Sequence, residues 1–142
     1  MGKIYLSVLR DINYKLVGID WYLIGKTNLL LQGVDVEPSK IGILIQYKDL
    51  DKVWELLKDY KKSEIIELDN KEAKEFYFYI NDIKIEICAE YSHGTYWKLL
   101  DKHVDYRLGE SSMKLFSLKS EMKAYELLGD EEMSRKISGC IS

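Results

Sequence analysis

The sequence predicts an α/β (α+β) protein, with helices packed on a mixed twisted sheet, and three observations lead to this prediction. Two apolar segments, 20–25 and 40–47, are typical of buried strands, and they flank a short apolar segment that begins after Gly25. Residues 49–61 place apolar side chains at helical spacing, which predicts an amphipathic helix. The Asn-Asp pair at 81–82 separates two apolar runs, as in a two-residue β-hairpin.

The N-terminal part begins with an amphipathic pattern. Residues 3–17 carry apolar side chains near helical spacing, and we expect this helix to end at Gly18. The segment 26–32 predicts a short buried helix, whose start Thr27 or Asn28 can cap.

A loop with the only proline follows at 34–39, before the second central strand, 40–47. Strand alternation sorts its side chains into two sets. One face receives Ile41, Ile43 and Ile45, and the other receives Lys40, Gly42, Leu44 and Gln46.

The middle of the chain predicts a short strand at 64–68 and hairpin strands at 75–80 and 83–88. We expect an irregular loop with one helical turn over 91–112, which holds both histidines and mixes aromatic with charged residues.

The C-terminal part predicts an edge strand at 113–118 and a last helix over 120–137, broken near 129–130. Ser117 or Ser120 can cap the start of that helix.

The 142 residues are expected to form one domain (1–142), with a core over about 18–90 and a C-terminal strand and helix at 113–137. A hydrophobic share of 46% and a charged share of 32% indicate a globular chain. The net charge of −3 argues against non-specific nucleic-acid binding. No apolar run is long enough for a membrane span and no secretion signal is visible, so a cytoplasmic location without membrane attachment is expected.

Several common sites are absent from the sequence. Cys88 and Cys140 belong to no metal-binding pattern, and Cys88 is expected to be a buried thiol. The chain has no hydrolase nucleophile elbow, no P-loop and no dinucleotide-binding glycine motif.

The order of elements and glycines resembles the nucleotidyltransferase superfamily with the polymerase-beta-like fold, and within it the minimal nucleotidyltransferases. The resemblance covers nearly the whole chain and is strongest over 21–57, where WYLIGKTNLLLQG fits the family pattern of tryptophan, apolar residues, glycine step and later glycine. It returns at 83–87 and in the closing segment 115–137.

The resemblance implies a specific chemistry. The family places a Gly-Ser or Gly-Gly turn against nucleotide phosphates, and three carboxylates on later strands hold two magnesium ions. Here Gly25 matches the motif glycine, Lys26 replaces the small second residue, Lys40 and Gly42 replace the first two carboxylates, and Glu86 matches the third.

The resemblance therefore implies a degenerate member, in which Asp-x-Asp has become Lys40-x-Gly42 and Glu86 is the remnant carboxylate. One carboxylate cannot hold two magnesium ions, and the Lys40 ammonium would repel a cation. No metal site or cofactor is expected, and no other catalytic residue. Mg²⁺ and a nucleoside triphosphate would be needed only by an active enzyme, with Glu86 as the one metal ligand on offer. We expect Lys40 and Glu86 to pair across neighbouring strands.

Three functions remain open at this point. The first is a pseudoenzyme that binds a nucleotide or phosphate through Gly25, Lys26, Lys40 and Gly42, or binds a protein partner. The second is an active nucleotidyltransferase, as in toxin–antitoxin-like systems, in which nearby carboxylates such as Asp35, Glu37 or Asp49 substitute. The third is an interaction module, for example a homodimer.

Two further groups have alternative interpretations. His93 follows the Glu86 strand and is near enough to reach a cleft, whereas His103 has no metal-spaced partner, and both also fit as ordinary surface residues. Tyr91, Tyr96, Trp97 and Tyr106 can stack a base or form a minor core.

Overall fold

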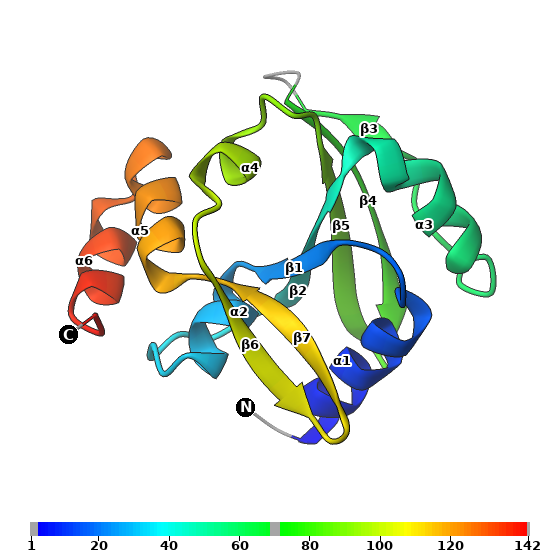
Figure 1. Ribbon diagram of the computed structural model, residues 1–142, viewed down its shortest axis with the longest axis horizontal. Coiled ribbons are helices and arrows are strands. Elements are labelled where there is room, and N and C mark those ends of the chain that lie inside the picture. Colours follow the sequence, from blue (N-terminus) through cyan, green and yellow to red (C-terminus); the bar gives the residue numbers. More distant parts are fainter. Residues whose placement is uncertain (1–2, 69–71, 142) are drawn as a thin grey trace.

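The computed structural model describes residues 3–68 and 72–141 (Figure 1). In chain order the elements are α1 (Lys3–Lys15), β1 (Trp21–Ile24), α2 (Lys26–Leu31), β2 (Lys40–Gln46), η1 (Tyr47–Asp49), α3 (Leu50–Leu56), β3 (Ile66–Glu67), β4 (Ala73–Ile80), β5 (Ile83–Glu90), α4 (Thr95–Leu99), β6 (His103–Leu108), β7 (Ser111–Phe116), α5 (Leu118–Leu127) and α6 (Glu131–Ser138). None of the described helices is long and apolar enough to cross a membrane.

One seven-stranded mixed sheet joins the N-terminal and C-terminal parts of the chain, in the order β3-β4-β5-β2-β1-β7-β6. Strand β2 lies between β1, which is antiparallel to it, and β5, which is parallel. Gly42 of β2 therefore stands between Ile24 and Glu86 on the two neighbouring strands. The predicted fold class, a mixed sheet with packed helices, is confirmed.

The sheet has two differently covered faces. Helices α1 and α3 pack on one face, over the main core, which includes Ile41, Ile43 and Ile45 as predicted. Helix α4 packs on the other face, over a smaller cluster of Tyr22, Ile24, Leu44 and Phe116. Helices α5 and α6 stand beside α2 and α4, on the opposite side of the molecule from α1 and α3 (Figure 1). The second face is therefore only partly covered, and its open parts carry the polar side chains of β2 and β5.

The hairpin and the helix breaks follow the expected chemistry. Asn81 and Asp82 both have positive φ, 49° and 64°, as a two-residue turn between twisted strands requires. Ser117 caps α5 by accepting from the amide of Ser120, and Asp130 caps α6 after the break at Gly129.

The segment 91–112 is more regular than the sequence predicts. It contains α4 and all of β6, and β6 is the edge strand of the sheet, so the prediction of an edge strand at 113–118 is wrong. The corresponding strand β7 is paired on both sides. The sequence does carry a strand signal there, because Val104, Tyr106 and Leu108 alternate with polar residues, although five of the six residues of β6 are exposed or half-buried. The prediction of a loop is therefore wrong for 103–108.

Two helix predictions also need correction. Neither Thr27 nor Asn28 caps α2, because Gly25 is the capping residue and no side chain bonds there. The predicted helix over 49–61 is shorter in the structure, where α3 spans Leu50–Leu56 and the 3-10 turn η1 precedes it. The hydrophobic stripe nevertheless faces the core as expected, with Val53 and Leu57 buried.

Candidate functional site

The residues that the sequence singles out converge at the start of β2, on the partly covered face. Gly25 ends β1 with φ 84° and ψ −162°, a backbone conformation that is essentially reserved for glycine. The following residues turn into α2, and the buried Thr27 hydroxyl donates to the carbonyl oxygen of Lys40 at 2.8 Å. This hydrogen bond ties the glycine turn to the first residue of β2.

Gly42 is required by the close approach of β1. A Cβ atom at this position would lie 2.9 Å from the Ile24 carbonyl oxygen and 3.1 Å from the Ile24 side chain. A main-chain atom cannot move aside as a flexible side chain does. The position that would carry the second carboxylate in the resembled family therefore has no room for one without a shift of β1.

Lys40 and Glu86 form the predicted ion pair. The Lys40 ammonium lies 2.9 Å from a Glu86 carboxylate oxygen across the parallel pair β2–β5. Their side chains are 47% and 23% exposed, so solvent screens the pair and its contribution to stability is small. The pair matters for the chemistry of the site, because the Lys40 ammonium already neutralises the Glu86 carboxylate.

A cavity of about 270 Å³ opens at this point. It is lined by Ile24, Gly25, Lys26, Ser39, Lys40, Gly42, Glu86, Tyr96, Tyr125 and Leu128. We call it the lysine cavity. Lys26 is exposed, and within the described residues its ammonium makes no hydrogen bond or ion pair. All the predicted nucleotide-binding residues, together with Glu86, therefore line one cavity, with one paired and one unpaired lysine.

A buried glutamate that the sequence analysis missed holds the glycine turn from behind. Glu121 of α5 is fully buried, and its Oε2 accepts from the Gly25 amide at 2.7 Å and from the Asn28 side-chain amide at 2.8 Å. The Asn28 amide also donates to the Phe116 carbonyl oxygen. The Gly25 amide, which the resemblance would direct at a phosphate, is thus occupied by a carboxylate of the chain itself.

The second oxygen of Glu121, Oε1, is buried without a hydrogen-bond partner in the described part of the chain. Burial raises the pKa of this carboxyl to about 7, and the hydrogen bonds from Asn28 and Gly25 only partly oppose that rise. The sequence offered one signal, since Glu121 and Ala124 share a helical face and Ala124 is a core residue. An acidic residue in the first turn of a helix is so common on surfaces that this signal is weak.

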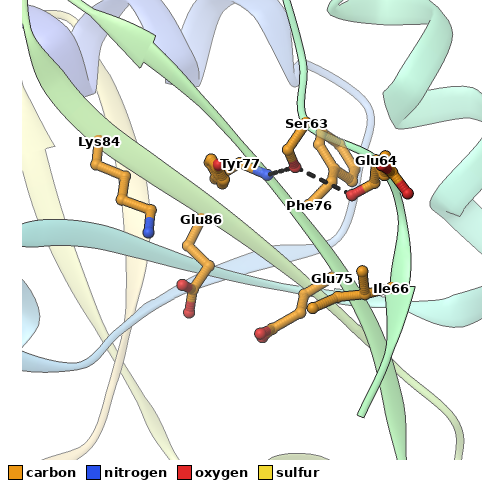
Figure 2. Close-up of a pocket in the computed structure, with 8 residues that line it drawn as sticks. All are labelled: Ser63, Glu64, Ile66, Glu75, Phe76, Tyr77, Lys84 and Glu86. Atoms are coloured by element: carbon orange, nitrogen blue, oxygen red, sulfur yellow. Dashed lines mark hydrogen bonds between the residues drawn. The ribbon is translucent and has the colours of Figure 1, made fainter.

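Two further carboxylates, Glu64 and Glu75, lie in a hollow next to the lysine cavity. Glu86 also lines a neighbouring hollow of about 360 Å³ over β4 and β5, with Glu75, Glu64 and Lys84 (Figure 2). Figure 2 shows Glu75 and Glu86 projecting from neighbouring strands, and burial followed by the charge of Glu86 raises the pKa of Glu75. The Lys84 ammonium lies over the Tyr77 ring, 4.3 Å from its centre.

The donor set does not fit a two-magnesium centre. Among residues 3–68 and 72–141, no group of three or more histidine, cysteine, aspartate and glutamate side chains is arranged to hold a metal ion. Asp35, Glu37 and Asp49, the substitutes weighed from the sequence, do not line the lysine cavity. Glu86 remains the one carboxylate there, and Lys40 is bound to it.

The other predicted residues go to different places. His103 lies on β6 with its Nε2 atom 3.1 Å from an Asp105 oxygen. Tyr106 packs against the main core, and Tyr96 lines the lysine cavity. The cavity at the opposite end of β2 receives Tyr91, His93 and Trp97. Tyr96 and Trp97 also pack on the smaller cluster with Tyr22 and Phe116, so the alternative of a minor core holds for these two rings and not for Tyr91 and Tyr106.

Cys88 is buried on β5 as predicted, and Cys140 is exposed; both are free thiols. Burial raises the pKa of the Cys88 thiol, with Glu90 and Glu75 adding to the effect. A thiol held in its protonated form is a poor nucleophile.

Comparisons with known proteins bear on the fold. No family model matches the sequence, and no curated protein matches it significantly. Among solved structures, the chain is similar to the crystal structure of a candidate nucleotidyltransferase from Thermotoga maritima, with a TM-score of 0.73 and 20% sequence identity. The match covers 98% of this chain and 94% of that one. The chain therefore shares the fold of that structure over nearly its whole length.

Proposed function

We propose that this protein is a degenerate nucleotidyltransferase-like protein that binds a nucleotide or phosphate ester in the lysine cavity, without two-metal nucleotidyl transfer. The observation that carries the proposal is the Lys40–Glu86 contact of 2.9 Å, in a cavity that also holds the unpaired Lys26. An ammonium in this position attracts phosphate and repels magnesium.

The cavity supports a particular mode of binding. The two lysines supply positive charge, and the hydroxyl-bearing rings of Tyr96 and Tyr125 lie at its wall. Since Glu121 occupies the Gly25 amide, the phosphate is expected to rest on the lysine side chains rather than in the glycine turn. A volume of about 270 Å³ is just below the usual range of ligand pockets, so it suits a phosphate group or a small phosphate ester.

The lack of room for a side chain at Gly42 favours this proposal over an active nucleotidyltransferase. The tight approach of Ile24 to Gly42 supports the proposal, because a side chain at residue 42 would meet the Ile24 carbonyl oxygen. An active nucleotidyltransferase would need that carboxylate or a substitute, and Glu86 alone is present in the cavity.

The test is a set of thermal-shift and calorimetric titrations with each nucleoside triphosphate and with inorganic phosphate, in the presence of Mg²⁺ or a chelator. Ligand at roughly a hundredfold its Kd should raise Tm by about 5–10 °C, equally with and without Mg²⁺. Lys26→Ala and Lys40→Ala should weaken binding, whereas Lys52→Ala, an exposed lysine of α3, is the matched control. No shift with any of these ligands would refute the proposal, and strictly Mg²⁺-dependent binding would favour the active enzyme.

A further inference from the structure

Another hollow lies on the same sheet face as the lysine cavity, at the opposite ends of β2 and β5. Its volume is about 530 Å³, and four of its lining residues carry rings: Tyr47, Tyr91, His93 and Trp97. We call it the aromatic hollow. Lys40 and Gln46 are the two ends of β2, so the aromatic hollow and the lysine cavity are separated by roughly 20 Å of strand. They share no lining residue.

We propose that the aromatic hollow is a second binding site, which takes a planar heteroaromatic ring carrying an anionic group, the chemical class of a mononucleotide. This inference goes beyond the function proposed for the lysine cavity and does not depend on it.

Three of the rings contact one another along the hollow. Tyr91 and His93 are stacked, parallel within 2° and with ring centres 5.5 Å apart, and Tyr47 lies 4.3 Å from Tyr91 at a tilt of 31°. Trp97 also lines the hollow, and its ring stands edge-to-face with Tyr22 at 5.5 Å. A further planar ring can stack against such a group, because stacking requires only a flat π-face and apolar walls.

Buried hydrogen bonds hold these rings in place before any ligand arrives. Glu90 is 4% exposed, and its two oxygens accept from the amides of Tyr96 at 3.1 Å and Trp97 at 2.9 Å. Gly94 makes this possible, since a Cβ there would lie 2.6 Å from the Glu90 carboxyl carbon. The Trp97 indole nitrogen donates to the Ile45 carbonyl oxygen at 3.1 Å.

The loop that carries the stacked pair is fixed as well. The Tyr91 amide donates to the Glu72 carbonyl oxygen at 2.9 Å, and the Gly94 amide donates to the Tyr91 carbonyl oxygen at 2.8 Å. The Thr95 hydroxyl donates to a Glu72 carboxylate oxygen at 2.7 Å. A site that is ordered in advance loses less entropy when it binds.

The polar side chains of the hollow, Lys48 and Glu90, favour a ligand that carries both an anionic group and an N–H donor. Lys48 lines it, is exposed, and has no ion-pair partner in the part of the chain that the structure describes. Glu90 also lines it, and a carboxylate oxygen that already accepts one hydrogen bond can accept another from a ring N–H or exocyclic amine. A base with an attached phosphate offers both partners. The net charge of −3 favours such a small ligand over a polyanionic strand.

The test uses the full chain with Lys26→Ala and Lys40→Ala, so that the lysine cavity does not contribute. Calorimetry and tryptophan fluorescence, to which Trp97 contributes beside Trp21 and Trp54, are recorded with adenosine 5′-monophosphate, adenosine and ribose 5-phosphate. We expect the monophosphate to bind tightest, adenosine to bind more weakly, and ribose 5-phosphate not to bind. Tyr91→Leu should weaken the monophosphate by about fivefold or more. Tyr91→Phe, which keeps the ring, should not.

Further variants keep the result decisive. Lys48→Ala should weaken the monophosphate but leave adenosine unchanged, and Lys52→Ala should change neither. If Tyr91→Leu fails to fold, His93→Ala gives the same comparison at an exposed ring. The proposal is overturned by undetectable binding at millimolar ligand, by equal binding to Tyr91→Leu, or by ribose 5-phosphate binding as well as the nucleotide. A short oligoadenylate that binds more than tenfold tighter at these residues would also overturn it, in favour of a nucleic-acid strand.

Discussion

The lysine cavity and the aromatic hollow lie on one sheet face, and each is supported by a buried glutamate that accepts two N–H groups. Glu121 accepts from Gly25 and Asn28 behind the lysine cavity, and Glu90 accepts from Tyr96 and Trp97 at the aromatic hollow. The difference lies in the second oxygen. Both Glu90 oxygens have a partner, whereas Glu121 places both hydrogen bonds on Oε2, and its Oε1 has no partner among the residues that the structure describes.

A buried glutamate can therefore hold a site in place in two ways. Its ionised form is costly where one oxygen has no hydrogen-bond partner, and less costly where both oxygens have one. Burial raises the pKa of both carboxyls, but two main-chain amides pull against that rise at Glu90. Glu121 is more deeply enclosed, and its pKa reaches about 7. The lysine cavity should therefore respond to pH near neutrality through its supporting carboxyl, and the aromatic hollow should respond less.

The largest expected effect is the pH dependence of stability. Below pH 4.5 the Glu121 carboxyl is protonated in both the folded and the unfolded chain. Between pH 4.5 and about 7 this carboxyl ionises only in the unfolded chain. The free energy of unfolding should therefore fall as pH rises through this range. Glu121→Gln should remove up to about 3 kcal/mol of this loss, measured by urea unfolding at pH 5 and pH 8.

Glu90→Gln sharpens the comparison, because it should change the pH dependence less than Glu121→Gln does. An unchanged pH profile in Glu121→Gln would show that Glu121 is ionised in the folded chain throughout this range. The two oxygens of the carboxylate would then not differ as described.

A smaller effect on the free energy of unfolding is expected when a side chain is placed at Gly42, where β1 and β2 approach closely. Gly42→Ala places a methyl group 2.9 Å from the Ile24 carbonyl oxygen, so the free energy of unfolding should fall by about 2 kcal/mol. Gly139→Ala is the matched control, since its Cβ would meet no atom closer than 3.6 Å. Equal stability of the two variants would mean that β1 moves freely and that the carboxylate position is not blocked.

The smallest effect on stability is expected at the ion pair. Glu86→Gln should cost less than about 1 kcal/mol, because the Lys40 side chain is 47% exposed. The same change frees the Lys40 ammonium, so phosphate should bind the lysine cavity more tightly in a calorimetric titration. Weaker phosphate binding in Glu86→Gln would contradict the assignment of Lys40 as the phosphate ligand.

The sequence predicted the central architecture because the residues that specify it carry strong local signals. The alternation over β2, the Asn-Asp turn and the Ser117 cap each depend on a few neighbouring residues. The Lys40–Glu86 contact was also predictable, once the family resemblance had placed both residues on neighbouring strands.

The missed features depend on distant contacts. Strand β6 is the exception, because Val104, Tyr106 and Leu108 alternate with polar residues and so give a local strand signal that the loop prediction overlooked. Glu121 looks like an ordinary acidic residue at a helix start, and only the tertiary fold brings it to the Gly25 amide. The division of the aromatic run depends on α4, where the neighbouring residues Tyr96 and Trp97 line different hollows.

The Gly25–Glu121 contact has a consequence for the order of folding. It joins residues 96 positions apart, and β1 gains its second neighbour only when β7 pairs with it. Contacts with such long sequence separation pay a large loop-closure entropy and form late. The β4–β5 hairpin, whose strands are joined by two residues, can form early and independently. The glycine turn should thus remain open to water in folding intermediates and close only as α5 docks.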